Sequence, residues 1–222
     1  KENIDKNEII NLKKDLGLKK TDFIVLYVGR IAKEKSIDFL INNFNSVLKQ
    51  IPKAKMIIVG DGPDIKDLID LAKKEGLENK IIFAGKAPWT DVPKYYSLCD
   101  VFVTASKTET QGLTVMEAMG ASKPVVAIRD ESFELMITDK KDGLFFDDEK
   151  SYVDMIYEVY KNKKLRDEIS FNARLTADKY SPCNYAKNVL KVYDKVISKD
   201  TNVVKKVVHN VKKIFTKSGG KK

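Results

Sequence analysis

Residues 101–128, which read VFVTASKTETQGLTVMEAMGASKPVVAI, decide the fold. Two short apolar runs at 101–105 and 124–128 enclose a polar loop and a stretch with helical spacing that Gly112 opens. The runs show little polar alternation, which is typical of parallel strands that helices cover on both faces. This stretch therefore predicts one strand–helix–strand unit.

The same alternation extends through most of the chain. Further apolar runs occupy residues 23–28, 55–59, 80–84 and 143–146. Helical spacing lies between them, over residues 37–48 (stopped by Pro52), 65–72 and 92–98. Strands that alternate with helices are joined by right-handed crossovers into an open, doubly wound sheet. We expect an α/β, Rossmann-like fold with a parallel sheet of about six strands.

The two ends of the chain lack the alternation of strand-like and helical segments. Residues 1–20 predict a polar helix that ends at Gly17, and residues 148–198 show only helical patterns. From residue 199 onward, eight lysines stand against one aspartate, a net charge of +7 out of +9 for the whole chain. The prediction is one domain over residues 1–198 with terminal helices, and a basic amphipathic tail over 199–222.

Composition excludes several classes of protein. The chain has 222 residues, 43% of them hydrophobic, which is enough for a packed core. No apolar run approaches the roughly 18 residues of a membrane-spanning helix. Two cysteines cannot make a disulfide framework, and the single histidine, His209, leaves little material for a serine-protease-type triad or a histidine metal site. Residues 1–10 contain no apolar secretion-signal core. The low cysteine content fits a reducing cytosol, so we expect a cytoplasmic protein.

The turn after the first strand contains two cations. In an open parallel sheet, ligands bind outside the carboxyl ends of the strands, so each such turn is a candidate site. Gly29 permits a tight turn, and Arg30 and Lys35 follow it. Two cations at this position suit a diphosphate, although a solvated basic loop would have the same composition.

The next two turns are less specific. After the second strand comes Gly60-Asp61-Gly62-Pro63, whose glycines permit close backbone approach and whose proline can start a helix. After the third comes Gly85-Lys86. Both are also compatible with ordinary strand-to-helix turns.

The turn after the fourth strand combines a helix start with two acids. The free amides of Gly112, Leu113 and Thr114 could hold a phosphate oxygen. Glu109 precedes the helix and Glu117 lies about one and a half turns inside it. Carboxylates accept hydrogen bonds from sugar hydroxyls, but a capping acid plus a surface glutamate would also explain the pair.

Taken together, these turns resemble the donor-binding half of a retaining glycosyltransferase with the GT-B fold, and more closely glycosyltransferase group 1 (family 4). Gly29-Arg30 with Lys35, the Gly60 to Pro63 turn, and Glu109 followed after seven residues by Glu117 carry the resemblance. It covers roughly residues 10–198. The resemblance implies that a hexose is transferred from a nucleotide diphosphate sugar with retention of configuration, without a metal or a cofactor.

The resemblance also implies roles for individual residues. Arg30 and Lys35 contact the diphosphate, Glu109 the transferred sugar and Glu117 the ribose. Lys86 lies near the base. The residues so assigned are Arg30, Lys35 and Glu109 for catalysis, and Gly29, Gly60, Lys86, Gln111, Gly112, Leu113, Thr114 and Glu117 for donor binding.

Two departures from the family pattern concern specificity. Ser36 stands where the family usually has glycine, and Gln111 where many members have phenylalanine. Thr-Gln-Gly at 110–112, with the segment 129–133, resembles the branch that makes diacylglycerol glucosides from UDP-glucose. A mannosyltransferase that uses GDP-mannose, or a nucleotide-binding module without catalysis, remains the alternative.

The resemblance covers only the second of the two domains of a GT-B enzyme. We therefore expect the acceptor domain to lie outside this chain, and the isolated chain to bind nucleotide weakly and to transfer nothing. The tail could lie on an anionic membrane surface as a peripheral contact, or could pack its valines against protein.

Other classes fit the sequence less well. A sugar-nucleotide epimerase shares the fold but would be expected to use a histidine at the cleft, and the only histidine is in the tail. A phospho-acceptor receiver domain needs acids where Gly29-Arg30 and Gly85-Lys86 stand. A nucleic-acid-binding module needs basic and aromatic residues interleaved on one face, whereas the tail offers only Phe215.

Overall fold

A computed structural model describes residues 5–109 and 112–199 of the chain. These residues fall into two compact units, which divide between Ala177 and Asp178. The strands are β1 (Phe23–Val28), β2 (Ala54–Val59), β3 (Ile81–Gly85), β4 (Val101–Thr104), β5 (Val125–Ile128) and β6 (Leu144–Phe146). The helices are α1 (Lys6–Asp15), the 3-10 turn η1 (Lys33–Lys35), α2 (Ile37–Asn42), α3 (Phe44–Gln50), α4 (Ile65–Lys74), α5 (Val92–Leu98), α6 (Leu113–Gly120), α7 (Glu131–Glu134), α8 (Glu149–Lys161), α9 (Lys163–Lys179) and α10 (Pro182–Lys199).

The first unit is built on a parallel sheet of six strands in the order β3-β2-β1-β4-β5-β6. β1 lies in the middle, where Val25 is in register with Met56 of β2 and Val101 of β4. The α/β, Rossmann-like fold class is confirmed. The strand order reverses between β1 and β4, because the chain crosses from one edge of the sheet back to its centre.

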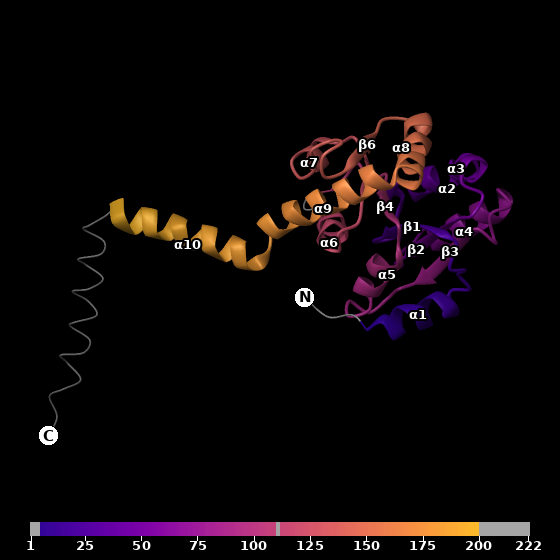
Figure 1. The fold of residues 1–222 in the computed structure, drawn as a ribbon, viewed down its shortest axis with the longest axis horizontal. Helices are drawn as coiled ribbons and strands as arrows, with labels where there is room; N and C mark the ends of the chain where they lie inside the picture. The colour runs from indigo at the N-terminus through magenta and orange to yellow at the C-terminus, as the bar shows by residue number, and fades with distance from the viewer. Residues whose placement is uncertain (1–4, 110–111, 200–222) are drawn as a thin grey trace, which may run out of the picture. The chain divides into compact units, whose positions relative to one another are not determined.

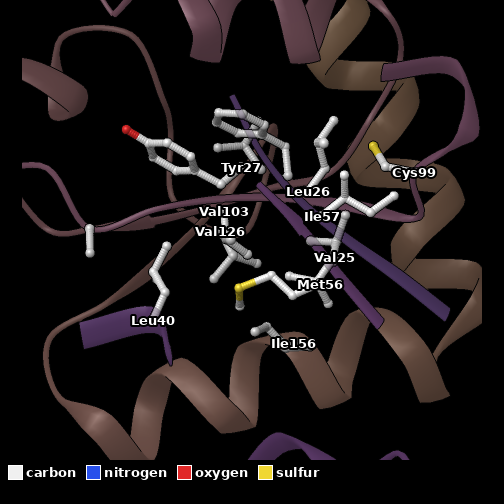
Figure 2. Packing of buried hydrophobic residues seen from close by; sticks show 14 of the residues in the cluster. Val25, Leu26, Tyr27, Leu40, Met56, Ile57, Cys99, Val103, Val126 and Ile156 are labelled. Atoms are coloured by element: carbon white, nitrogen blue, oxygen red, sulfur yellow. The ribbon is translucent and has the colours of Figure 1, made fainter. Parts of the chain in front are cut away.

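Helices cover both faces of this sheet (Figure 1). α5 contacts α1 and α6 on one face, while α8 contacts α3, and α2 contacts α3 and α4, on the other. Figure 2 shows the consequence for side chains: Val25 and Met56 lie toward Ile156 of α8, and Leu26 and Ile57 lie toward Cys99. Since successive strand residues point to opposite faces, every residue of β1 is buried. This explains the unbroken apolar runs of the sequence.

The helix expected over residues 37–48 is wrong in one respect, because the structure breaks it at Asn43 into α2 and α3. The Asn43 backbone N–H and side-chain amide both donate to the Phe39 carbonyl, at 3.2 and 2.9 Å. Asparagine commonly competes with the helix ladder in this way. The short helix α7 was also not expected from the sequence; Asp130 caps it by accepting from the Ser132 N–H at 3.0 Å.

The second unit contains the long helix α10. It begins at Pro182, and the Ser181 carbonyl accepts from the Tyr185 N–H at 2.9 Å. Large apolar side chains on it are exposed, namely Tyr185, Leu190, Val192, Tyr193 and Val196. Across the helices that the structure describes, none has the length and hydropathy to cross a bilayer. Apart from Lys199, the predicted tail lies outside the described residues.

One buried polar group in the core leads to a stability prediction. The Tyr152 ring is fully buried against Phe146 and Phe39, with ring centroids 5.2 and 5.7 Å away. Its hydroxyl has no hydrogen-bond partner among the described residues. Because an unsatisfied buried hydroxyl costs about 1–3 kcal/mol, Tyr152→Phe should raise the free energy of unfolding by about 1 kcal/mol. Urea denaturation of both proteins measures this difference.

Tyr27→Phe is the matched control, because the Tyr27 hydroxyl does donate a hydrogen bond, to the Arg30 carbonyl at 3.1 Å. That variant should lower the free energy of unfolding. A loss of stability in Tyr152→Phe as well would show that its hydroxyl is satisfied, and would contradict the prediction.

Candidate functional site

The main candidate site lies where the strand order reverses, at the carboxyl ends of β1 and β4. Such a switch point opens a crevice, because the loops that follow the two strands run in opposite directions. A hollow at this place is lined by Tyr27, Val28, Gly29, Arg30, Lys35, Thr104, Glu109, Gly112, Leu113 and Thr114. The structure thus brings together seven of the sequence-predicted residues, namely Gly29, Arg30, Lys35, Glu109, Gly112, Leu113 and Thr114.

Tyr27 fixes the loop after β1 through a hydrogen bond. The Tyr27 hydroxyl donates to the Arg30 carbonyl at 3.1 Å. Burial, reinforced by the carboxylates of Glu109 and Glu34, raises the pKa of Tyr27 well above its ordinary value. The phenol therefore keeps its proton, and this hydrogen bond, to a higher pH than an ordinary tyrosine would. The Arg30 guanidinium itself is exposed and lies 3.6 Å from Glu34, so it is free to turn toward a ligand.

Gly60, at the end of β2, supports this loop without lining the hollow. Its φ is +146°, and a Cβ placed there would lie 1.8 Å from the Gly29 carbonyl oxygen. No side chain can occupy that space, so only glycine lets the turns after β1 and β2 pack against each other. The Gly29 N–H donates to the Val59 carbonyl at 3.0 Å, which closes this contact.

Lys35 and Glu109 form an ion pair inside the hollow. The Lys35 Nζ lies 2.6 Å from the Glu109 Oε1 and 3.4 Å from the Ser106 Oγ. The two side chains are only 18% and 21% exposed. Residues that lie 74 positions apart in the sequence therefore share one charge-assisted hydrogen bond. Ser106, which the sequence did not single out, completes the contacts of this lysine.

Gly112 sets the start of helix α6. It is the N-cap, with the left-handed backbone angles φ +52° and ψ 36°. The backbone N–H groups of the first helical turn have no partner inside the helix, and Leu113 and Thr114 line the hollow. The partial positive charge of a helix N-terminus thus points at the same space as the two cations. Gln111, also predicted for this site, lies outside the described residues.

Glu117 belongs to a second hollow that shares Val28 with the first. Its lining runs between α5 and α6, and includes Trp89, Val92, Pro93, Tyr96 and Arg174. The buried Tyr96 hydroxyl lies 2.9 Å from the Glu117 Oε2 and 3.1 Å from the Thr114 carbonyl. Burial and the negative charge of Glu117 raise the pKa of Tyr96 strongly, so the phenol remains a donor to a higher pH than an ordinary tyrosine.

The sequence did not reveal Tyr96 as a site residue, because its helical spacing marks it only as part of a buried face. Lys86 differs from the other predicted residues. Its side chain is exposed and lines a separate depression between α1 and α5, together with Glu8 and Lys94. The structure does not bring it into either hollow.

The two adjoining hollows can bind a ligand with two kinds of group. Cations and free amides around the first hollow favour an anion such as a diphosphate. Carboxylates at Glu109 and Glu117 favour neutral hydroxyl groups on either side of it. Within residues 5–109 and 112–199, no three His, Cys, Asp or Glu side chains gather closely enough to hold a metal ion.

Comparison with known families and proteins agrees with this arrangement. The family model described as "Glycosyl transferases group 1" matches residues 8–176. The chain belongs to this glycosyltransferase family, which confirms the resemblance found in the sequence.

Two curated relatives are alpha-monoglucosyldiacylglycerol synthases. The one from Acholeplasma laidlawii is 36% identical over 198 residues, which is 88% of this chain and 49% of the relative. The one from Streptococcus pneumoniae is 30% identical over 196 residues, 88% of this chain and 44% of the relative. The chain thus spans about half the length of the curated relatives it matches.

Solved structures with the same fold include HepE of Anabaena in complex with UDP and glucose. It matches with a TM-score of 0.77 at 21% identity, over 86% of this chain and 53% of that one. A C-terminal domain of the group 1 protein LpcC from Francisella tularensis matches with a TM-score of 0.68 at 25% identity, over 78% of this chain and 92% of that domain. In that group 1 protein, the matching fold is the C-terminal domain.

Ser36, next to Lys35, leads to a second stability prediction. Its backbone is left-handed, with φ +49° and ψ 41°, which costs a side-chain-bearing residue about 1–2 kcal/mol. This explains in physical terms why glycine suits the position. Ser36→Gly should raise the free energy of unfolding by about 0.5–1 kcal/mol, after the greater freedom of glycine in the unfolded chain is deducted.

Urea denaturation tests Ser36→Gly. Ser46→Gly, within helix α3, is the matched control and should destabilise the protein. A loss of stability in both variants would contradict the strain at Ser36.

Proposed function

We propose that this chain is the donor-binding part of a retaining hexosyltransferase, with a nucleoside diphosphate sugar, UDP-glucose in the first place, as its substrate. The observation that carries the proposal is the convergence of Arg30, Lys35 and the α6 N-terminus on one hollow that Glu109 also lines. It is an anion site next to a hydroxyl-accepting group, as a sugar diphosphate requires.

The diphosphate occupies the first hollow in this proposal. Lys35 and Arg30 contact its oxygens, and the amides of Leu113 and Thr114 hold the distal phosphate. Negative charge develops on the leaving diphosphate as the glycosidic bond breaks. Preorganised donors of this kind typically lower a barrier by roughly 2–4 kcal/mol each, so these groups supply catalysis as well as binding.

The nucleoside occupies the second hollow. Glu117 accepts hydrogen bonds from the ribose hydroxyls, and the Tyr96 hydroxyl holds its carboxylate in place by a hydrogen bond to Oε2. Trp89 is 80% exposed at the rim of this hollow, where its ring can stack on a base. A contact of Lys86 with the base rests on the family resemblance alone.

Names of related proteins support the choice of substrates. Three Anabaena HepE structures contain UDP, UDP with glucose, or UDP-glucose. The two curated relatives described above make a monoglucosyl diacylglycerol by name, so we propose diacylglycerol as the acceptor. Since those relatives are about twice as long as the part matched here, the acceptor site and its catalytic groups are assigned to a partner domain. The isolated chain should bind donor and transfer nothing.

Titration of the chain with UDP, GDP and ADP tests the donor assignment. We expect the highest affinity for UDP, measured by calorimetry at low salt. A preference for GDP would favour a GDP-mannose-dependent mannosyltransferase, and no binding of any of the three would contradict a donor site.

Lys35→Ala should weaken UDP binding by about 10- to 100-fold, since a hydrogen bond to a charged group contributes about 1.5–3 kcal/mol. Lys73→Ala is the matched control, because Lys73 pairs with Asp70 on the exposed surface of α4. Its UDP affinity should equal that of the wild type. Unchanged UDP affinity in Lys35→Ala would contradict the role assigned to this lysine.

We further propose that the basic segment from residue 199 onward contacts an anionic membrane surface, where the acceptor resides. Lysines near such a surface contribute roughly 1 kcal/mol each. In co-sedimentation, the chain should bind vesicles that contain anionic lipid and not neutral ones. A chain that ends at residue 198 is the control and should lose this binding. Equal binding to both kinds of vesicle would contradict the proposal.

A further inference from the structure

The ion pair between Lys35 and Glu109 has a consequence for which ligand the site prefers. Under the proposed function, on which this inference rests, Lys35 serves the diphosphate and Glu109 serves the sugar. In the structure the two bond to each other at 2.6 Å instead. A ligand that uses only one of them must therefore compete with the other.

We propose that this pair makes the site discriminate against a nucleoside diphosphate without a sugar. A bare diphosphate draws the Lys35 ammonium toward itself, and leaves the Glu109 carboxylate without its cation and close to a second negative charge. At 21% exposure, water only partly replaces the lost partner. The free energy lost when Glu109 gives up its cation therefore weakens binding of the bare diphosphate.

A sugar on the diphosphate removes this penalty. Its hydroxyl groups donate hydrogen bonds to Glu109, so the carboxylate exchanges one partner for another. The sugar also separates the carboxylate from the phosphates. Lys35 is thus free to contact the diphosphate when a sugar occupies Glu109. The pair also favours release of the bare diphosphate that remains after the sugar has been transferred.

The surroundings of the pair support an exchange of partners. The Lys35 Nζ has three donors, of which one is directed to Glu109, while Ser106 Oγ lies at the longer distance of 3.4 Å. Tyr27, which lines the same hollow, keeps its proton to a higher pH than an ordinary tyrosine, because burial and the negative charge of Glu109 raise its pKa. Among the described residues, Lys35 is the one cation that is paired with Glu109, so a ligand that draws Lys35 away leaves the carboxylate without an ion-pair partner.

Calorimetric titration of Glu109→Gln with UDP and UDP-glucose tests the inference. The amide retains size and polarity but not charge. We expect UDP to bind about three- to tenfold more tightly than to the wild type, because the released lysine no longer belongs to an ion pair. The ratio of UDP-glucose affinity to UDP affinity should fall by about tenfold.

The same substitution in a Lys35→Met background separates partner exchange from simple repulsion. Without the lysine there is no pair to break, and only the direct repulsion between carboxylate and diphosphate remains. Glu109→Gln should then raise UDP affinity by clearly less than it does in the wild-type background. An equal gain in both backgrounds would overturn the inference, as would unchanged or weaker UDP binding in Glu109→Gln alone. Asp70→Asn, which removes a carboxylate from the Lys73 pair on α4, controls for net charge and should leave both affinities unchanged.

Binding of UDP and UDP-glucose by the wild-type chain shows whether the inference alone fails or the proposed function fails as well. If the wild type binds neither UDP nor UDP-glucose, the donor assignment fails and the inference fails with it. If the wild type binds both and the Glu109→Gln affinities equal those of the wild type, only the inference is overturned. Thermal unfolding of each variant shows whether an altered affinity comes from a folded protein.

Discussion

The reversal of strand order between β1 and β4 is the constraint on which the rest of the structure depends. β1 pairs with β2 on one side and with β4 on the other. The chain therefore leaves the carboxyl ends of β1 and β4 in opposite directions. The sheet itself thereby separates two loops and keeps a space between them. Every residue that lines the first hollow comes from β1 or β4, or from the loop or helix that follows one of them.

Rigid packing below the loops converts this space into a defined site. Gly60 admits the Gly29 carbonyl where any Cβ would collide with it, and Tyr27 ties down the next carbonyl along the chain. On the other side, Tyr96 joins Glu117 to the first turn of α6. Buried phenols thus hold the Arg30 carbonyl and the Glu117 carboxylate in place. Their raised pKa values extend their range as hydrogen-bond donors to a higher pH than that of an ordinary tyrosine.

The sequence predicted the strands to within a residue or two, because buried parallel strands have a distinctive composition. It also placed most of the lining of the first hollow, since the turns after parallel strands must meet at one edge. It could not predict Tyr96 or Ser106, whose roles depend on partners brought near by the fold. It gave no sign that Lys35 and Glu109 would pair, and the break at Asn43 arose from a side-chain hydrogen bond that helical spacing does not encode.

The two cysteines differ in a way that makes the second unit accessible to experiment. Cys99 is buried, and burial raises the pKa of its thiol to about 12, so it forms almost no thiolate at neutral pH and resists alkylation. Cys183, in the first turn of α10, is exposed. A maleimide reagent should therefore attach to one position without any mutation. A fluorophore or spin label there would report directly on what surrounds this helix, in water, beside lipid or against another protein domain.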